Sequence, residues 1–133
     1  MIGLDIGERR VGVAVSDELH VIASPVESVD LKRGGMQALL AVIERYNPER
    51  IIVGLPTGMS GREGPQAKAV REFVKQLRET ITTPITFWDE RMTTSIAQQA
   101  LITSGRRRRA RKERVDAVAA AVILQSYLDS RRR

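Results

Sequence analysis

Acidic residues at three places in the sequence could bind a metal ion. Asp5 interrupts the apolar run of residues 2–6, and a carboxylate there is unfavourable to bury unless a cation or hydrogen bonds compensate it. Asp89 and Glu90 follow a second apolar stretch, and Asp116 precedes a stretch rich in alanine and valine. Because the chain has no cysteine and one histidine, oxygen ligation of Mg²⁺ or Mn²⁺ is the metal chemistry that these residue types suit.

Two of these acids have equally good structural interpretations. Asp116 could complement the dipole of a helix that begins beside it. Asp89 could cap the following helix or pair with Arg91. Glu90 has no comparable structural role, so we favour it over Asp89 as the ligand, and the choice between the two stays open.

Two further segments could bind phosphate. A loop containing Gly54, Gly58, Gly61 and Gly64 precedes a helical pattern, and its backbone N–H groups could cradle a phosphate, although it lacks a Walker A sequence. Residues 106–114 hold seven basic side chains and one acid, which favours a salt-sensitive contact with a polyanion. The alternative for this run is a solvated or disordered basic segment. The basic candidates for nucleic-acid binding are Arg106, Arg107, Arg108, Arg109, Arg111 and Lys112.

The composition is that of a globular protein with a local excess of positive charge. The chain has 133 residues, which predicts a single domain over residues 1–133, and it has no apolar run long enough to span a membrane. The formal charge is +6, yet outside residues 106–114 and 131–133 there are 12 basic and 15 acidic residues. Since cysteine is absent and no secretory leader precedes the first strand pattern, we expect a cytoplasmic location.

The hydrophobic pattern predicts an α/β fold, in which helices flank a mixed sheet. Residues 2–6 and 11–16 form an antiparallel hairpin, and residues 21–26 form a third strand at an edge or ending near Pro25. The remaining strands are expected at residues 50–54 and 85–88, and the helices at residues 36–46, 65–77, 93–105 and 115–128.

These motifs together resemble the YqgF/RuvX family of the RNase H-like superfamily, described as Holliday junction resolvases and as nucleases of precursor 16S ribosomal RNA. The resemblance runs from end to end of the chain. It rests on residues 3–7 with 11–17, on residues 52–56 with Gly61 and 64–65, on residues 89–94, and on residues 115–124.

The resemblance implies an RNase H-like fold, with a five-stranded mixed sheet whose first three strands are antiparallel and with helices on both faces. It implies that Asp5, Glu90 and Asp116 are catalytic and bind Mg²⁺ or Mn²⁺. Related resolvases carry the second acid after the fourth strand, whereas the fourth strand here ends in residues 54–56 without an acid. The implied substrate is branched DNA or precursor ribosomal RNA, and cutting both strands of a junction would favour a homodimer.

Two other functions fit some of the same residues. Actin-like and sugar-kinase-like nucleotide-binding modules also open with an Asp-x-Gly turn between two strands, but they need two copies of the fold to enclose ATP. A nucleic-acid-binding protein without catalytic activity could retain the acids and the arginine run. We therefore expect a metal-dependent endonuclease, with these two classes as alternatives.

Overall fold

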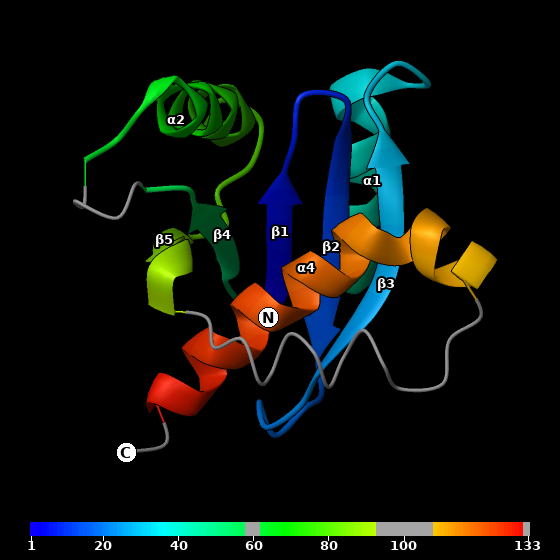
Figure 1. Ribbon diagram of the computed structural model, residues 1–133, viewed down its shortest axis with the longest axis vertical. Helices are drawn as coiled ribbons and strands as arrows, with labels where there is room; N and C mark the ends of the chain where they lie inside the picture. Colours follow the sequence, from blue (N-terminus) through cyan, green and yellow to red (C-terminus); the bar gives the residue numbers. More distant parts are fainter. Residues whose placement is uncertain (58–61, 93–107, 132–133) are drawn as a thin grey trace.

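The computed structural model describes residues 1–57, 62–92 and 108–131, with the side chains of residues 108–114 excepted (Figure 1). The described elements follow one another along the chain in the predicted order. The helix predicted at residues 93–105 lies outside the described residues. The elements are β1 (Ile2–Ile6), β2 (Arg10–Ser16), β3 (Ala23–Asp30), α1 (Gly35–Tyr46), β4 (Ile51–Leu55), α2 (Pro65–Arg78), β5 (Ile85–Asp89), the 3₁₀ turn η1 (Glu90–Met92) and α4 (Arg108–Arg131).

The five strands form one mixed sheet in the order β3-β2-β1-β4-β5. β1, β2 and β3 pair antiparallel, whereas β4 lies between β1 and β5 and is parallel to both. This arrangement confirms the predicted five-stranded sheet and its antiparallel first three strands. The strands β1, β4 and β5 therefore end at the same edge of the sheet, which is where open α/β sheets collect ligands.

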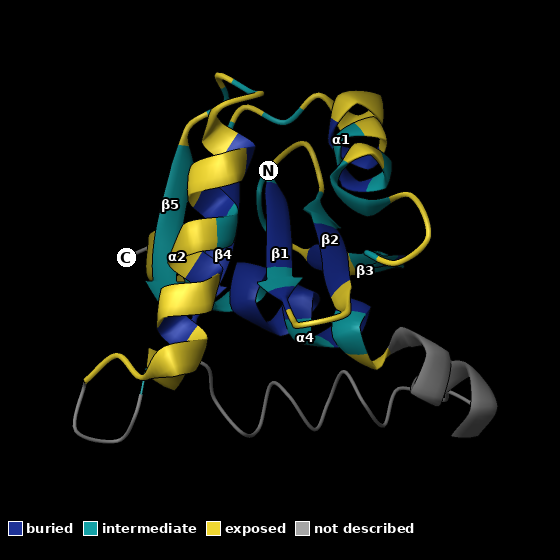
Figure 2. Ribbon diagram, turned by 90° about the horizontal axis from the view of Figure 1, so that it is seen from above, coloured by how far each residue is buried: buried dark blue, intermediate teal, exposed yellow. Residues whose placement is uncertain are grey.

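Helices cover both faces of the sheet (Figure 2). α1 and α2 pack on one face, and α4 lies across β1, β2, β3 and β4 on the other. Successive side chains of a strand point to opposite faces, so Ile2, Leu4 and Ile6 enter the core beneath α1 and α2. Asp5 consequently faces α4, and the alternation of β1 is what places this carboxylate between the sheet and the last helix.

Two elements extend several residues beyond their predicted bounds. β3 continues to Asp30 rather than ending near Val26, because pairing with β2 through an irregularity at Val13/Ala14 holds its polar second half in the sheet. Its place at the sheet edge agrees with the presence of Pro25. α4 begins at Arg108 rather than at Val115, because arginine, lysine, alanine and glutamate are themselves good helix formers.

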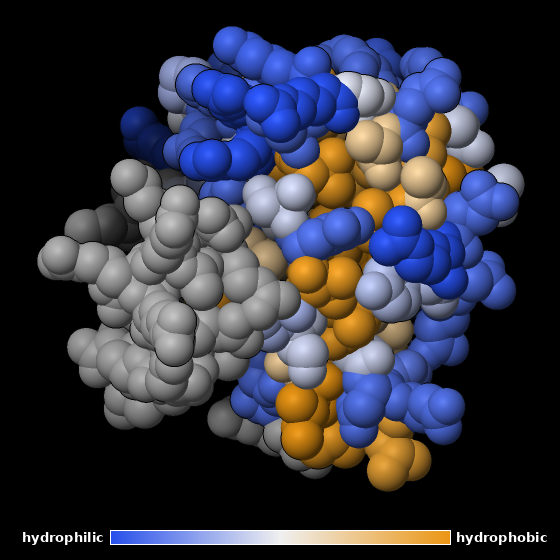
Figure 3. Space-filling model, turned by 90° about the vertical axis from the view of Figure 1, so that its right-hand side faces the viewer, coloured by the Kyte–Doolittle hydropathy of each residue, from blue (hydrophilic) through white to orange (hydrophobic). Residues whose placement is uncertain are grey.

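The surface combines a charged exterior with local hydrophobic exposure. On the side that α1 and β3 occupy in Figure 1, hydrophobic side chains form a band between hydrophilic ones (Figure 3). Within the part of the chain that the structure describes, no helix combines the length and the hydrophobicity that crossing a membrane requires.

Candidate active site

Asp5 lies partly buried in the central strand, with two other carboxylates near it. Burial raises the pKa of Asp5 to about 6, and the negative charges of Glu90 and Asp116 add to that effect. Both causes favour the neutral acid, because the charged form loses water and meets like charges. The three acids predicted from the sequence therefore share one region of the fold, although they come from β1, η1 and α4.

Asp116 reaches this region because α4 approaches the sheet very closely at Gly12. A Cβ atom at Gly12 would overlap the backbone carbonyl of Asp116, and Gly12 pairs with Asp5 in the β1–β2 ladder. The Asp116 carboxylate accepts a hydrogen bond from Ser28 Oγ at 3.1 Å and lies 3.0 Å from Arg10 Nε. Two neighbouring strands thus orient the side chain through a single oxygen, Oδ2.

The prediction that Asp116 lies in the first turn of the last helix is wrong. Because α4 begins at Arg108, Asp116 lies more than two turns inside the helix and not in the first turn. The dipole of α4 therefore no longer explains this acid, since that effect is confined to the first turn. Its interactions with Arg10 and Ser28 explain its orientation instead.

Glu90 reaches the site from the turn that follows β5. Its Oε1 lies 3.0 Å from the position that a Cβ at Gly54 would occupy, so the absence of a side chain in β4 makes room for it. Burial raises the pKa of Glu90, and the charge of Asp89 adds to this. Ser126 of α4 holds the turn in place, because it accepts from Trp88 Nε1 at 3.0 Å and donates to the Met92 carbonyl at 2.9 Å.

Asp89 has a different environment from its neighbour. Thr57 Oγ1 donates to it at 2.7 Å, and Arg91 donates through its backbone N–H at 2.9 Å and its side-chain NH2 group at 2.7 Å. These contacts, with that of Arg91 foremost, hold the pKa of Asp89 well below its usual range. The pairing with Arg91 is the structural role considered above for Asp89, and it favours Glu90 as the functional acid.

The phosphate-binding predictions fall only partly within the described residues. Gly54 is buried in β4 and Gly64 precedes α2 with extended backbone, whereas Gly58 and Gly61 lie outside the described residues. Arg106 and Arg107 lie outside them too. Backbone alone is described for Arg108, Arg109, Arg111 and Lys112, and it is helical. Among the described residues, no three acidic or histidine side chains are arranged so as to hold one ion together.

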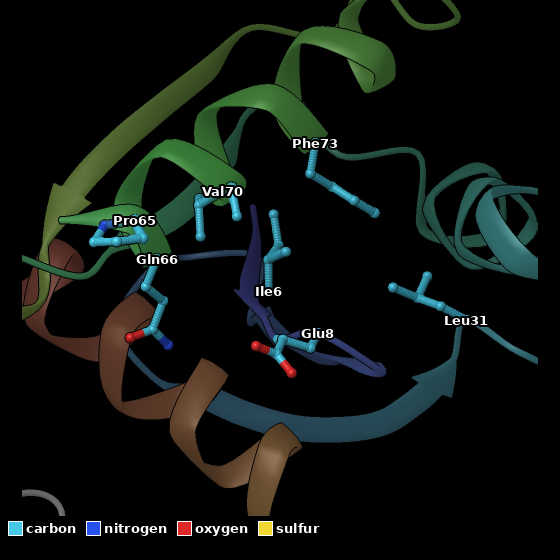
Figure 4. A pocket seen from close by; sticks show the side chains of 9 residues that line it. Ile6, Glu8, Leu31, Pro65, Gln66, Val70 and Phe73 are labelled. Atoms are coloured by element: carbon cyan, nitrogen blue, oxygen red, sulfur yellow. The ribbon is translucent and has the colours of Figure 1, made fainter. Parts of the chain in front are cut away.

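A cavity of about 670 Å³ opens beside the β1–β2 turn, on the face of the sheet that α2 covers (Figure 4). Ile6, Val70 and Phe73 contribute apolar walls, and Glu8 and Gln66 contribute its polar groups. The cavity lies between β1 and α2, whereas Asp5 faces α4, so the candidate acids are not part of its lining.

Comparison with known proteins places the chain in a family. Residues 1–130 match the family model described as "RuvX: Holliday junction resolvase". The chain belongs to the RuvX family. A relative in Geobacillus kaustophilus (strain HTA426), named "Putative pre-16S rRNA nuclease", is 45% identical over 98% of both chains. A relative of the same name in Ruegeria pomeroyi (strain ATCC 700808 / DSM 15171 / DSS-3) is 43% identical over 97% of this chain and 85% of its own.

Solved structures of resolvases share the fold of this RuvX protein. The Fowlpox virus resolvase bound to Holliday junction DNA superposes with a TM-score of 0.60 at 16% identity, with full coverage of both chains. Thermus thermophilus RuvC bound to a Holliday junction gives 0.57 at 18% identity, over 98% of this chain and 94% of that one. The RNase H-like fold expected from the resemblance is thereby confirmed.

Several polar residues of this RuvX protein that surround the acids were missed in the sequence. Arg10 and Ser28 contact Asp116, and Thr57 contacts Asp89. Ser126 supports the turn that carries Glu90. The one available signal was the position of Arg10 close after Asp5, since serine and threonine at strand and helix surfaces are too common to stand out.

Proposed function

We propose that this RuvX protein is a metal-dependent endonuclease that hydrolyses phosphodiester bonds in structured nucleic acid. The observation that carries the proposal is the convergence of Asp5, Glu90 and Asp116 at one edge of an RNase H-like sheet. The names of the family and of its relatives supply the chemistry that such a group of acids would perform.

The donor chemistry of the three acids fits Mg²⁺ or Mn²⁺. Carboxylate oxygens are hard ligands, and Asp5 lies in a cluster of negative charge that a divalent cation would relieve. Mg²⁺ is usually held by one or two carboxylates together with water, so a simultaneous contact with all three acids is not required. When bound, such an ion would activate water and neutralise charge on the phosphate.

Other residues of the chain would position these acids and the substrate. Arg10 and Ser28 both contact Oδ2 of Asp116. They thereby fix the orientation of the carboxylate, including its other oxygen, Oδ1. The guanidinium of Arg10 is more than half exposed and brings a positive charge to a region of three acids. It would lessen the repulsion between those acids and an approaching phosphodiester.

Phosphate contacts away from the acids would hold the nucleic-acid backbone. The run from Arg106 to Lys112 is the candidate for affinity without base selection, since contacts to phosphate carry no sequence information. The glycines of the loop 54–64 would approach a phosphate through backbone N–H groups.

Precursor 16S ribosomal RNA is the substrate that we propose first. The reason is that relatives above 40% identity, aligned over 85% or more of their own length, are named as nucleases of pre-16S rRNA. Four-way DNA junctions are the second candidate, from the description of the family model. A homodimer would suit the second substrate, because a junction is resolved by two cuts.

A cleavage panel tests the proposal. Precursor 16S RNA, a four-way DNA junction and linear duplexes of both kinds are incubated at one salt concentration with Mg²⁺, with Mn²⁺ or with a chelator. We expect cleavage of at least one structured substrate with either cation and none with the chelator. Undiminished cleavage by an Asp5→Asn variant, or cleavage that survives chelation, would contradict the proposed site.

A further inference from the structure

A row of four basic side chains follows the exposed side of α2, on the face of the sheet opposite to α4. The residues are spaced three or four apart, so they lie on one side of the helix over a length of about 15 Å. All four are exposed, as is much of the outer side of α2 in Figure 2. We call this row the α2 stripe, and it consists of Lys68, Arg71, Lys75 and Arg78.

The two arginines of the α2 stripe are held in place by the neighbouring strand. The guanidinium carbons of Arg71 and Arg78 lie 4.8 and 5.7 Å from the ring centroid of Phe87 in β5. Arg71 also forms a two-pronged ion pair with Glu63, at 2.6 and 2.7 Å. Because such contacts reduce side-chain freedom, these cations are partly ordered before any ligand arrives.

The charge of the α2 stripe contrasts with that of the rest of the protein body. Outside residues 106–114 and 131–133, acidic residues outnumber basic ones by 15 to 12, and four of those 12 form the stripe. Glu63 offsets part of this charge beside Arg71, and the exposed Glu72 and Glu79 lie next to the stripe, so the net excess is smaller than four charges. Lys68, Lys75 and Arg78 have no ion pair of their own among the described residues. Local excess of this kind on an otherwise acidic body is typical of a surface for a polyanion.

The α2 stripe leads away from the edge of the sheet that carries the acids. α2 begins at Pro65, beside the ends of β1 and β5 (Figure 2). Arg78, at the far end of the stripe, donates to the carbonyl of Ile85 where β5 begins, at 3.4 Å. β5 then runs back toward the acids and ends directly before Glu90. The stripe thus runs alongside β5, with Lys68 nearest to the acidic edge.

We propose that the α2 stripe binds the sugar-phosphate backbone of a nucleic-acid arm that extends from the acidic site along β5. This inference rests on the proposed nuclease function and adds a binding surface separate from residues 106–114. The stripe contacts phosphates and not bases, because its groups are cations spaced along a convex helix. It therefore contributes affinity and the direction of the arm, and no sequence preference.

The test removes two charges from the stripe without touching the arginines that stack on Phe87. In the Lys68→Gln/Lys75→Gln variant helix propensity changes little, because lysine and glutamine are similar helix formers. The control Arg45→Gln/Arg131→Gln removes the same net charge where α1 and α4 end, near the opposite edge of the sheet. Circular dichroism checks that both variants fold.

The measurement is the salt dependence of binding to a labelled four-way DNA junction and to a precursor 16S RNA fragment, by fluorescence anisotropy in chelator. Each lost duplex phosphate contact lowers the slope of log K against log salt by about 0.9, so the stripe variant loses about 1.8 from it. At 0.15 M salt this corresponds to roughly 30-fold weaker binding, if binding at 1 M is unchanged. The control variant keeps the wild-type slope.

Two results would overturn the inference in distinguishable ways. If the wild type binds and cleaves but the stripe variant has the slope of the control, the α2 stripe is not a binding surface and the nuclease function stands. If the wild type neither binds nor cleaves any of these nucleic acids, the nuclease function and the stripe fail together.

Discussion

Replacing Asp5 with asparagine is expected to stabilise the folded protein near neutral pH. Asp5 is the acid whose pKa burial raises to about 6, with Glu90 and Asp116 adding to the effect. Folding therefore disfavours its ionised form, and an amide of the same shape removes that penalty. A buried charge that lowers stability is typical of a functional site, where the charge serves a ligand.

The size and the pH range of the effect follow from the two pKa values. An unfolded aspartate ionises near pH 3.9 and Asp5 in the folded protein near 6, a difference of about two units or about 3 kcal/mol. The folded state then binds more protons than the unfolded state between about pH 4 and pH 6. The wild type consequently loses up to about 3 kcal/mol of stability as the pH rises through that window, and Asp5→Asn does not.

Urea unfolding in chelator at pH 4 and at pH 7.5 measures this difference. At pH 4 we expect the variant and the wild type to differ by only about 0.5 kcal/mol, because Asp5 is then neutral in the folded state and about half ionised in the unfolded state. At pH 7.5 the variant should be more stable by about 3 kcal/mol. Equal stability at both pH values, or a variant that is less stable at pH 7.5, would refute the burial of Asp5 beside two like charges.

Asp89→Asn is the matched control, because the sign of its effect is opposite. Arg91 and Thr57 hold the pKa of Asp89 well below its usual range, so its ionised form stabilises the fold. That contribution is present above the unfolded pKa and disappears as the pH falls through the folded one. The Asp89→Asn variant should be less stable than the wild type at pH 7.5, and this difference in unfolding free energy should shrink in strong acid.

Three further predictions concern the framework around the acids. Gly12→Ala should lower the unfolding free energy by about 3 kcal/mol in urea titrations, because its Cβ would overlap the Asp116 carbonyl, and an unchanged value would contradict the close approach of α4. Ser126→Ala should lower the unfolding free energy by about 1 to 3 kcal/mol and slow cleavage, because the turn that carries Glu90 loses its hydrogen bonds to α4. Wild-type stability together with a wild-type rate would argue against Ser126 as the support of this turn. Arg91→Gln should raise the pKa of Asp89 in a carboxyl NMR titration, and a constant value would show that Arg91 is not its main partner.

The candidate acids could be found in the sequence because each breaks a pattern. Asp5 interrupts an apolar strand, and Glu90 follows the end of the last strand, where parallel sheets collect ligands. For Asp116 the sequence predicts the wrong local setting, because the arginine run indicates a break before the last helix. A charge pattern does not show whether the backbone beneath it is helical, and from Arg108 onward it is.

The contacts that orient the acids could not be predicted in the same way. Ser28 and Asp116 lie 88 positions apart, and their contact exists only because β3 extends beyond its apolar half and α4 crosses it. Gly12 offered no more than a small residue in a strand, yet it sets how closely the helix approaches. Such features depend on how sheet and helix pack, which local sequence does not encode.

Single-turnover cleavage by Asp116→Asn and by Asp129→Asn tests the central claim most directly, because both substitutions remove one carboxylate from α4. Asp129 is exposed near the far end of the helix and forms a hydrogen bond with Gln125. The proposed site predicts that Asp116→Asn slows Mg²⁺-dependent cleavage of precursor 16S RNA by roughly 100-fold or more, while Asp129→Asn cleaves at the wild-type rate. Equal rates for the two variants would contradict the assignment of Asp5, Glu90 and Asp116 as the catalytic acids.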